Sequence, residues 1–226
     1  MEKFQRTIQL IGNEAFKKLQ QTTVIVVGVG GVGSFAVESL VRSGVGSIVL
    51  IDKDTYEITN INRQWPANIN SIGKRKVEVV AEECLKISPA INIFTEYICL
   101  NADNIDEVFS KHLKSEVVVI DAIDDLKAKV ILLHYLKEHN IKFISSMGAA
   151  NLIEIESIKY GLLDKTAYCP VAKIIRKELG LLGASKDITV VYSTEERLPG
   201  SSDKGSVMPI TATFGLKLAM WVITEI

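Results

Sequence analysis

The segment that most restricts the possible folds is "VIVVGVGGVGSFAVESL", which begins at Val24. Its first half is a short apolar run rich in β-branched residues, which predicts a buried strand. The residues from Phe35 to Ser43 follow at helical spacing, so a glycine-rich turn is predicted between a strand and a helix. A turn in this position is typical of α/β proteins that bind a nucleotide.

The glycines of this turn fit the pattern G-x-G-x-x-G with Gly28, Gly30 and Gly33. In that pattern one glycine makes the tight turn, one lets a phosphate approach the backbone, and one lets the helix and the strand pack closely. An anion would then bind the free N–H groups at the helix N-terminus. The next predicted strand, "SIVLID", ends at Asp52, whose carboxylate could accept hydrogen bonds from a ribose. The alternative is a turn with a structural role only.

Predicted strands and helices alternate along most of the chain. The predicted strands span residues 23–28, 47–52, 91–96, 117–120, 141–145, 152–158 and 188–192. The predicted helices span residues 5–20, 32–43, 74–87, 103–113, 125–139 and 169–179, and a final helix follows. This order predicts an α/β, Rossmann-like, doubly wound and mainly parallel sheet, with an N-terminal helical segment and a C-terminal strand and helix extension. Ligands of such sheets bind at the carboxyl ends of the strands, where Gly28, Asp52 and Asp121 fall.

The composition is typical of one globular domain. The chain has 226 residues and no Pro/Gly/Ser-rich linker near its middle, so residues 1–226 are interpreted as a single domain. The formal net charge of −1 argues against strong non-specific binding of nucleic acid. A local basic patch for an RNA partner stays open, because net charge does not describe the distribution of charge.

The cysteines and the chain ends indicate a protein of the cytoplasm. The three cysteines, Cys84, Cys99 and Cys169, form no C-x-x-C pair, so neither a disulfide framework nor a four-cysteine zinc site is indicated. The N-terminus lacks the long apolar core of a secretory signal. The C-terminal segment is apolar, but Lys217 interrupts it, so a helix buried against the sheet is favoured over a membrane span.

Cationic residues after the second predicted strand distinguish a triphosphate site from a dinucleotide site. Arg63 and Lys74 lie in connecting or helix-initial positions, from which they could reach over the same crevice. Two cations there match the charge of a triphosphate and of the pyrophosphate that departs in adenylyl transfer. Asp54 and Asp121 could hold Mg²⁺ between the phosphates through oxygen ligands. The alternative for residues 74–76 is a solvated helix start.

Five motifs resemble, in order, those of the ThiF/MoeB/HesA superfamily, relatives of the ubiquitin-activating enzymes: "GVGGVGS", "LIDKD", "NINRQ", "GKRKVE" and "VIDAID". This superfamily adenylates carboxylates with ATP. The resemblance implies a ThiF-type ATP-binding adenylating domain, with Asp52 on the ribose and with Arg63, Lys74 and Asp121 as catalytic residues, Asp121 through Mg²⁺. The ATP-binding set that it implies is Gly28, Gly30, Gly31, Gly33, Asp52, Asp54, Asn60, Arg63, Gln64, Lys74 and Asp121.

Many members of this superfamily place an N-terminal arginine of one subunit in the ATP site of its partner. Arg6, in "QRTIQLIG", stands at the similar position, which implies a homodimer in which Arg6 is catalytic in trans. The apolar residues around it, such as Ile8 and Leu10, either pack on their own domain or form a symmetric interface. The resemblance favours the interface.

Further motifs resemble the family of tRNA threonylcarbamoyladenosine dehydratases over nearly the whole chain: "RTIQLIG", "VRSGVGSIVLIDKD", "NINRQ", "ISSMGAA", "CPVAKIIRKEL" and "VVYSTEE". This resemblance implies ATP-dependent cyclisation of N6-threonylcarbamoyladenosine at position 37 of tRNA. The carboxylate of the nucleoside would be activated as an acyl-adenylate, with release of AMP and pyrophosphate. The implied partners are the modified tRNA, a second copy of the chain and a sulfur-relay protein.

Two other classes of function stay open. The first is an adenylyltransferase that activates the C-terminus of a small ubiquitin-like or sulfur-carrier protein. Such enzymes usually carry two C-x-x-C pairs that bind zinc, and the chain has neither pair, so no zinc is expected. The second is a Rossmann protein that binds NAD or has no catalytic activity.

The segment around Cys169 has two possible roles. Cys169 precedes Pro170 at a predicted helix start, a position that favours the thiolate, so it is either a catalytic thiol or a structural helix cap. The helix carries Lys173, Arg176 and Lys177, which either touch RNA phosphates or form a solvated face. The polar segment 195–206 is either a lid over the site or an exposed connection.

Overall fold

The computed structural model of the protein describes residues 2–113, 116–196 and 205–226. The apolar run before the glycine turn forms β1 (Thr23–Val27), and the residues after the turn form α3 (Gly33–Ser43). The next strand, β2 (Ser47–Ile51), pairs in parallel with β1. Four of the five residues of each strand are buried, as expected for parallel strands covered on both faces. The predicted strand–turn–helix unit is therefore confirmed.

The sheet has seven strands in the order β3-β2-β1-β4-β5-β7-β6. The remaining strands are β3 (Asn92–Glu96), β4 (Val117–Asp121), β5 (Lys142–Ser146), β6 (Ile158–Leu162) and β7 (Thr189–Ser193). All neighbours are parallel except β6 and β7, which are antiparallel. The strand order reverses its direction between β1 and β4, and such a switch point opens a crevice at the carboxyl ends of the strands. The predicted doubly wound, mainly parallel sheet is confirmed.

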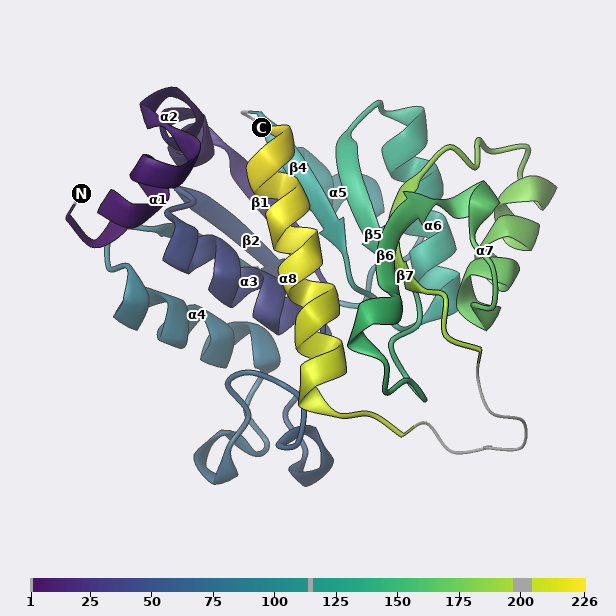
Figure 1. Cartoon of the computed structure of the whole chain (residues 1–226), viewed down its shortest axis with the longest axis horizontal. Coiled ribbons are helices and arrows are strands. Elements are labelled where there is room, and N and C mark those ends of the chain that lie inside the picture. Colours follow the sequence, from purple (N-terminus) through teal and green to yellow (C-terminus); the bar gives the residue numbers. More distant parts are fainter. Residues whose placement is uncertain (1, 114–115, 197–204) are drawn as a thin grey trace.

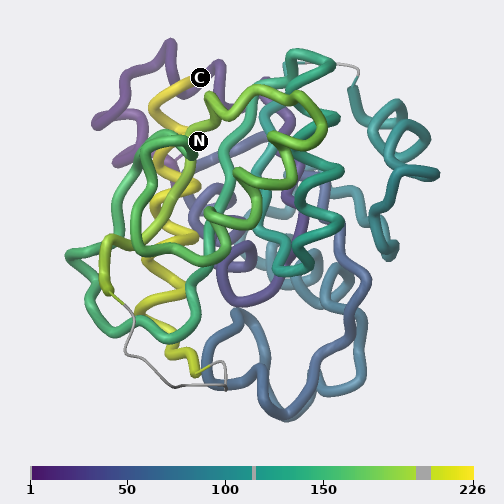
Figure 2. The backbone as a smooth tube through the Cα atoms, turned by 90° about the vertical axis from the view of Figure 1, so that its right-hand side faces the viewer, coloured from purple at the N-terminus to yellow at the C-terminus, as the bar shows by residue number. Residues whose placement is uncertain are grey.

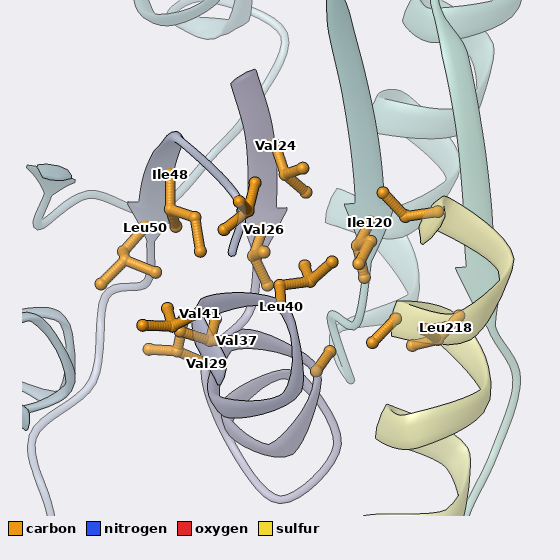
Figure 3. Packing of buried hydrophobic residues seen from close by; sticks show 14 of the residues in the cluster. Val24, Val26, Val29, Val37, Leu40, Val41, Ile48, Leu50, Ile120 and Leu218 are labelled. Atoms are coloured by element: carbon orange, nitrogen blue, oxygen red, sulfur yellow. The ribbon is translucent and has the colours of Figure 1, made fainter. Parts of the chain in front are cut away.

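Helices cover both faces of the sheet (Figure 1). One face carries α3, α4 (Lys76–Ile87) and α8 (Met208–Glu225), and the other carries α5 (Ile105–Ser110), α6 (Leu126–Glu138) and α7 (Pro170–Leu181). Figure 3 shows the first of these layers, where Val26 of β1 and Leu50 of β2 face Val37 and Leu40 of α3. Burial of these aliphatic side chains contributes on the order of 1.5–3 kcal/mol each.

The C-terminal helix α8 packs on the sheet rather than standing apart from it. Phe214, Leu218 and Val222 are fully buried on its inner side. The preference for a buried helix over a membrane span is confirmed for this segment. In the described parts of the chain, no helix combines the length and the apolar character needed to cross a membrane.

The N-terminal helical segment differs from the predicted helix over residues 5–20. It consists of α1 (Gln5–Ile11) and α2 (Asn13–Gln21), which are separated by Gly12. The φ of Gly12 is 85°, a backbone conformation that ends a right-handed helix and that glycine adopts at little cost. Helix α2 buries Phe16 and Leu19, whereas α1 buries none of its side chains. Ile11, at the end of α1, is partly buried against the core, so α1 is anchored less firmly than α2.

The predicted strand over residues 152–158 is wrong. Residues 152–157 lie outside the sheet and include a short 3-10 turn, Ile155–Ser157, and the strand β6 begins only at Ile158. The carboxylate of Glu195 accepts hydrogen bonds from the backbone N–H groups of Ile153 and Glu154, which therefore need no neighbouring strand. The alternating apolar residues of this segment were compatible with a strand, but its backbone N–H groups donate to the side chain of Glu195 instead of to a neighbouring strand.

Candidate active site

A cavity of about 320 Å³ lies at the carboxyl ends of the parallel strands. Its walls include the glycine turn after β1, residues 51–54 at the end of β2, 98–100 after β3, 122–125 after β4 and 146–151 at the end of β5. Loops from the two sides of the switch point thus meet in one pocket, which is the usual place for a ligand in a doubly wound sheet. The cavity coincides with the predicted crevice.

The glycines of the turn have different surroundings. A Cβ at Gly33 would overlap the carbonyl oxygen of Gly28, so Gly33 serves close packing and does not border the cavity. Gly28 has a φ of +88°, and a Cβ there would lie 2.6 Å from the carbonyl oxygen of Ala122. A Cβ at Gly30 would meet only Gln64 Nε2, at 3.8 Å, and both Gly30 and Gly31 border the cavity. Gly30 leaves room for a ligand to approach the backbone, whereas a Cβ at Gly31 would lie 3.2 Å from Arg63 O and Thr211 Cγ2, so Gly31 also serves close packing.

Asp52 borders the cavity and holds the glycine turn against the end of β2. Its Oδ2 accepts a hydrogen bond from Val29 N at 2.7 Å, and its Oδ1 accepts one from Asp54 N at 2.8 Å. Burial raises the pKa of this carboxyl above its ordinary value, and the nearby charge of Lys76 and the two backbone hydrogen bonds oppose the rise. Lone pairs of the carboxylate are left for donors from a ligand.

The segment between β2 and α4 extends beyond the carboxyl ends of the strands in both views (Figures 1 and 2). It brings Arg63 and Gln64 to the cavity. Arg63 Nη1 donates hydrogen bonds to Thr59 O at 2.7 Å and to Asn62 Oδ1 at 3.0 Å, which fix the guanidinium at the mouth. Gln64 Oε1 is buried and has no hydrogen-bond partner among the described residues. A ligand in the cavity could donate a hydrogen bond to this buried acceptor.

Asn60 is buried and does not border the cavity. Its Oδ1 accepts a hydrogen bond from Glu57 N at 3.1 Å and caps the short 3-10 turn Ile58–Asn60. Arg63 N donates a hydrogen bond to Asn60 O at 3.1 Å, so Asn60 shapes the backbone that presents the guanidinium. The structure therefore supports a contribution of Asn60 through the local fold rather than through contact with a ligand.

Lys76, and not Lys74, lies at the cavity. Lys74 is exposed and does not border it, whereas the side chain of Lys76 is only 7% exposed and its Nζ lies 2.9 Å from Asp54 Oδ2. An isolated bridge between Thr55 and Arg75 aligns the two segments, and Lys76 N donates to Asp54 O. This pairing directs the lysine two residues beyond the predicted one into the site. The predicted position of Lys74 at the phosphates is corrected accordingly.

Asp121 is fully buried and does not border the cavity. Its Oδ2 lies 2.6 Å from Lys129 Nζ and accepts a hydrogen bond from Ser145 Oγ at 2.5 Å, and its Oδ1 accepts one from Ile123 N. The carboxylate is thus used within the protein, which argues against the predicted contact with Mg²⁺. Within residues 2–113, 116–196 and 205–226, no group of three His, Cys, Asp or Glu residues could hold a metal ion by itself.

Two aspartates that follow β4 do border the cavity, Asp124 and Asp125. Asp125 caps α6 by accepting hydrogen bonds from Lys127 N and Ala128 N, and the bond from Ala128 N is the main cause that lowers the pKa of Asp125. Asp124 has no such capping role. Sequence reasoning missed Asp124, although its place in "DAIDD", directly after a strand end, is the signal that could have found it.

Cys169 and Arg176 contact other parts of the protein and not the cavity. Cys169 is buried in the apolar cluster between α6 and α7 and does not border the cavity, although Val171 does. Arg176 Nη1 donates hydrogen bonds to the carbonyl oxygens of Leu163 and Thr166, each at 3.1 Å. Of the predicted basic face, the exposed members are the two lysines at positions 173 and 177.

Arg6 is exposed on α1. Helices α1 and α2 lie next to the amino end of β1, at the opposite end of the sheet from the cavity (Figure 1). The guanidinium of Arg6 is therefore separated from the site of its own chain. Of the predicted segment 195–206, residues 197–204 lie outside the described residues, and Ser206 borders the cavity.

Comparisons with known proteins show which family this chain resembles over nearly its whole length. The ThiF family profile matches residues 4–225. A tRNA threonylcarbamoyladenosine dehydratase of Bacillus subtilis (strain 168) is 37% identical over 195 residues, which cover 86% of this chain and 76% of the relative. The crystal structure of the Escherichia coli tRNA N6-threonylcarbamoyladenosine dehydratase in complex with AMP superimposes with a TM-score of 0.93 at 32% identity and covers 99% of this chain and 93% of that chain. The complex of the same protein with ATP gives a TM-score of 0.92, with the same identity and coverage. The chain belongs to the ThiF family.

Proposed function

We propose that this protein is an ATP-dependent tRNA threonylcarbamoyladenosine dehydratase that acts on the modified adenosine 37 of tRNA in the cytoplasm. ATP is a substrate of this reaction. The carboxylate of the nucleoside attacks the α-phosphorus of ATP, and pyrophosphate leaves. An internal oxygen or nitrogen of the same group then attacks the activated carbonyl carbon, AMP leaves with the former carboxylate oxygen, and the ring closes. The net change in the nucleoside is the loss of one water.

The observation that carries this proposal is the convergence of four features on one cavity: Gly30 and Gly31, Asp52, Arg63 and Lys76. The glycines and the N-terminus of α3 would hold phosphate oxygens through backbone N–H groups. Asp52 would accept hydrogen bonds from the ribose hydroxyls. Arg63 and Lys76 would stabilise the charge that develops on the departing pyrophosphate. The close similarity to relatives named for the dehydration favours this reaction over activation of a carrier protein.

The charges at the cavity support a requirement for further cations. The four lysine and arginine side chains that border it are matched by four carboxylates: Lys53, Arg63, Lys76 and Lys129, and Asp52, Asp54, Asp124 and Asp125. In the described part of the chain, each of the three lysines is ion-paired with an aspartate and Arg63 has no such partner. A triphosphate and a carboxylate substrate would therefore leave a large uncompensated negative charge. We propose that Mg²⁺ bound through the phosphates supplies part of the compensation, and that Asp124, which borders the cavity, is its protein ligand in place of Asp121.

The proposed activity is tested by incubating the protein with ATP, Mg²⁺ and bulk tRNA that carries the threonylcarbamoyl modification. Release of AMP and a mass loss of one water from the nucleoside are expected. Transcribed tRNA without modifications is the control and should release no AMP. In parallel, ATP with Mg²⁺ should raise the melting temperature, while NAD should not. Release of pyrophosphate with a small carrier protein, whose C-terminus would keep the AMP as an acyl-adenylate, and no reaction with modified tRNA would favour the adenylyltransferase alternative. A sulfur-relay partner stays a prediction.

We further propose that the protein is a homodimer in which Arg6 enters the cavity of the partner. Helix α1 buries none of its side chains, and Leu10 on it is 81% exposed, so this helix offers a surface to a second copy. An isologous contact would bring one arginine to each of two cavities. The added cation would compensate part of the charge that one chain leaves unbalanced.

Mixing two inactive variants tests this arrangement. Arg6→Ala and Lys76→Ala subunits are each expected to be inactive alone. In a mixed dimer, the cavity of the Arg6→Ala subunit keeps its own Lys76 and receives Arg6 from the partner, so AMP release should return. Native mass spectrometry would verify that mixed dimers form. Mixed dimers without any activity would show that Arg6 does not serve the opposite site.

A further inference from the structure

A buried ion pair lies beneath the cavity and joins three segments of the chain. The side chain of Lys129, on α6, is 1% exposed and that of Asp121, at the end of β4, is 0% exposed. Lys129 Nζ donates hydrogen bonds to Asp121 Oδ2 at 2.6 Å and to the carbonyl oxygen of Ser146 at 3.1 Å. Ser146 is the first of residues 146–151, which form the β5 side of the cavity and are called the acceptor wall here.

The aspartate adds two further links. Its Oδ1 accepts a hydrogen bond from Ile123 N, in residues 122–125, which form the β4 side of the cavity. Its Oδ2 also accepts one from Ser145 Oγ, at the end of β5. The pair therefore connects the backbone that follows β4 with the backbone that begins the acceptor wall. Lys129 itself borders the cavity.

Stability alone is a weak reason for such a pair. Removing two charges from water costs several kcal/mol per ion, and apolar residues of similar volume are often as stable or more stable in the same place. Positioning of the backbone is a better reason for the ion pair, because charge-assisted hydrogen bonds are short and directional. Here they hold the relative position of two cavity walls that belong to different strands.

We propose that Lys129 is a positioning residue that fixes the acceptor wall, through Asp121 and the carbonyl oxygen of Ser146, for the nucleoside that carries the reacting carboxylate. The identity of that nucleoside rests on the proposed function. The residues assigned to ATP come from the glycine turn, from β2 and from residues 63–76, and the ammonium group of Lys129 donates to none of them. Asp124, proposed as a ligand of Mg²⁺, follows Ile123, whose backbone N–H donates to Asp121 Oδ1, and an asparagine at position 121 can still accept that hydrogen bond. Loss of the tether therefore disturbs the tRNA substrate more than it disturbs ATP.

The test uses the double variant Asp121→Asn/Lys129→Met, which removes both charges together and leaves no unpaired buried ion. The matched control is Lys137→Met, the same exchange on the same helix. Lys137 Nζ donates to the carbonyl oxygen of Asp187 at 2.9 Å, away from the cavity. Ser145→Ala is a milder variant, which removes one hydrogen bond to Asp121 and keeps the ion pair.

The double variant is expected to keep its urea midpoint and its stabilisation by ATP with Mg²⁺, while the KM for modified tRNA rises about 10-fold or more. Ser145→Ala should raise the same KM by a smaller factor, and Lys137→Met should leave it unchanged. Hydrogen exchange of residues 147–151 should become faster in the double variant and, to a smaller extent, in Ser145→Ala, and it should stay unchanged in Lys137→Met. If the double variant does not fold, Ser145→Ala becomes the test. An unchanged KM for modified tRNA together with unchanged hydrogen exchange in Ser145→Ala would then overturn the proposal.

A KM for tRNA equal to that of the wild type in a folded double variant overturns the proposal, because a purely structural pair predicts that result. A loss of stabilisation by ATP as large as the loss for tRNA also overturns it. If the wild-type protein released no AMP from modified tRNA, the proposed function would fail separately. Hydrogen exchange would then decide the positioning role, with unchanged exchange in residues 147–151 as the contradicting result.

Discussion

Replacing Lys76 by alanine is expected to lower ATP-dependent AMP release by about 100-fold or more, since it removes a charge that stabilises the departing pyrophosphate. The fold should survive the change. Asp54, the partner of Lys76, has a side chain that is 48% exposed, so water can solvate its carboxylate after the ion pair is lost. Single-turnover AMP release with modified tRNA measures the effect, and urea unfolding verifies the fold.

Lys74→Ala is the matched control for this prediction. It removes the same side chain two residues earlier, where the lysine is exposed and does not border the cavity. Its rate should stay close to that of the wild type. A large loss for Lys74→Ala together with a small loss for Lys76→Ala would contradict the assignment and restore the lysine that the sequence predicted.

Replacing Gly33 by alanine is expected to destabilise the fold by about 3 kcal/mol or more, at the upper end of the cost of overpacking. The new Cβ would overlap the carbonyl oxygen of Gly28 and lie 2.9 Å from its carbonyl carbon. These are backbone atoms of the turn, which cannot move aside as the end of a flexible side chain can. Chemical denaturation would show the loss as a lower free energy of unfolding.

Gly30→Ala provides the control within the same turn. A Cβ there meets nothing closer than Gln64 Nε2 at 3.8 Å, so the free energy of unfolding should change little. The methyl group would instead occupy the space through which a phosphate approaches the backbone, and the thermal stabilisation by ATP with Mg²⁺ should fall sharply. Equal stability of both variants would show that the turn relaxes more easily than its geometry indicates.

The order of the elements along the chain was predictable because it depends on local patterns. Buried parallel strands need continuous apolar runs, and the amphipathic helices between them need helical spacing, so the alternation from residue 23 onward indicated the doubly wound sheet. The two exceptions have different causes, one local and one distant in sequence. The backbone at Gly12 turns out of the helical region, and the side chain of Glu195, distant in sequence, satisfies the amides of Ile153 and Glu154.

Part of the site was also determined by the sequence alone. The spacing of Gly28, Gly30 and Gly33 and the position of Asp52 at a strand end are consequences of one βαβ unit, whose geometry varies little between proteins. Arg63 was predicted on the basis of a charge that a triphosphate needs, and the structure brings it to the cavity. Each of these positions is fixed by the element that carries it.

The tertiary structure alone decided which charge of a neighbouring pair reaches the cavity. Lys74 and Lys76 have the same side chain and lie two residues apart in the sequence. The bridge between Thr55 and Arg75 aligns the backbone so that Lys76 lies at the cavity. Asp121 was the predicted carboxylate, but burial beside α6 pairs it with Lys129, and Asp124, which the sequence analysis did not name, borders the cavity. A local pattern indicates which side chains lie near a strand end. The direction in which each of them points depends on partners distant in sequence, because a buried charge is stable only where an opposite charge lies within a few ångströms.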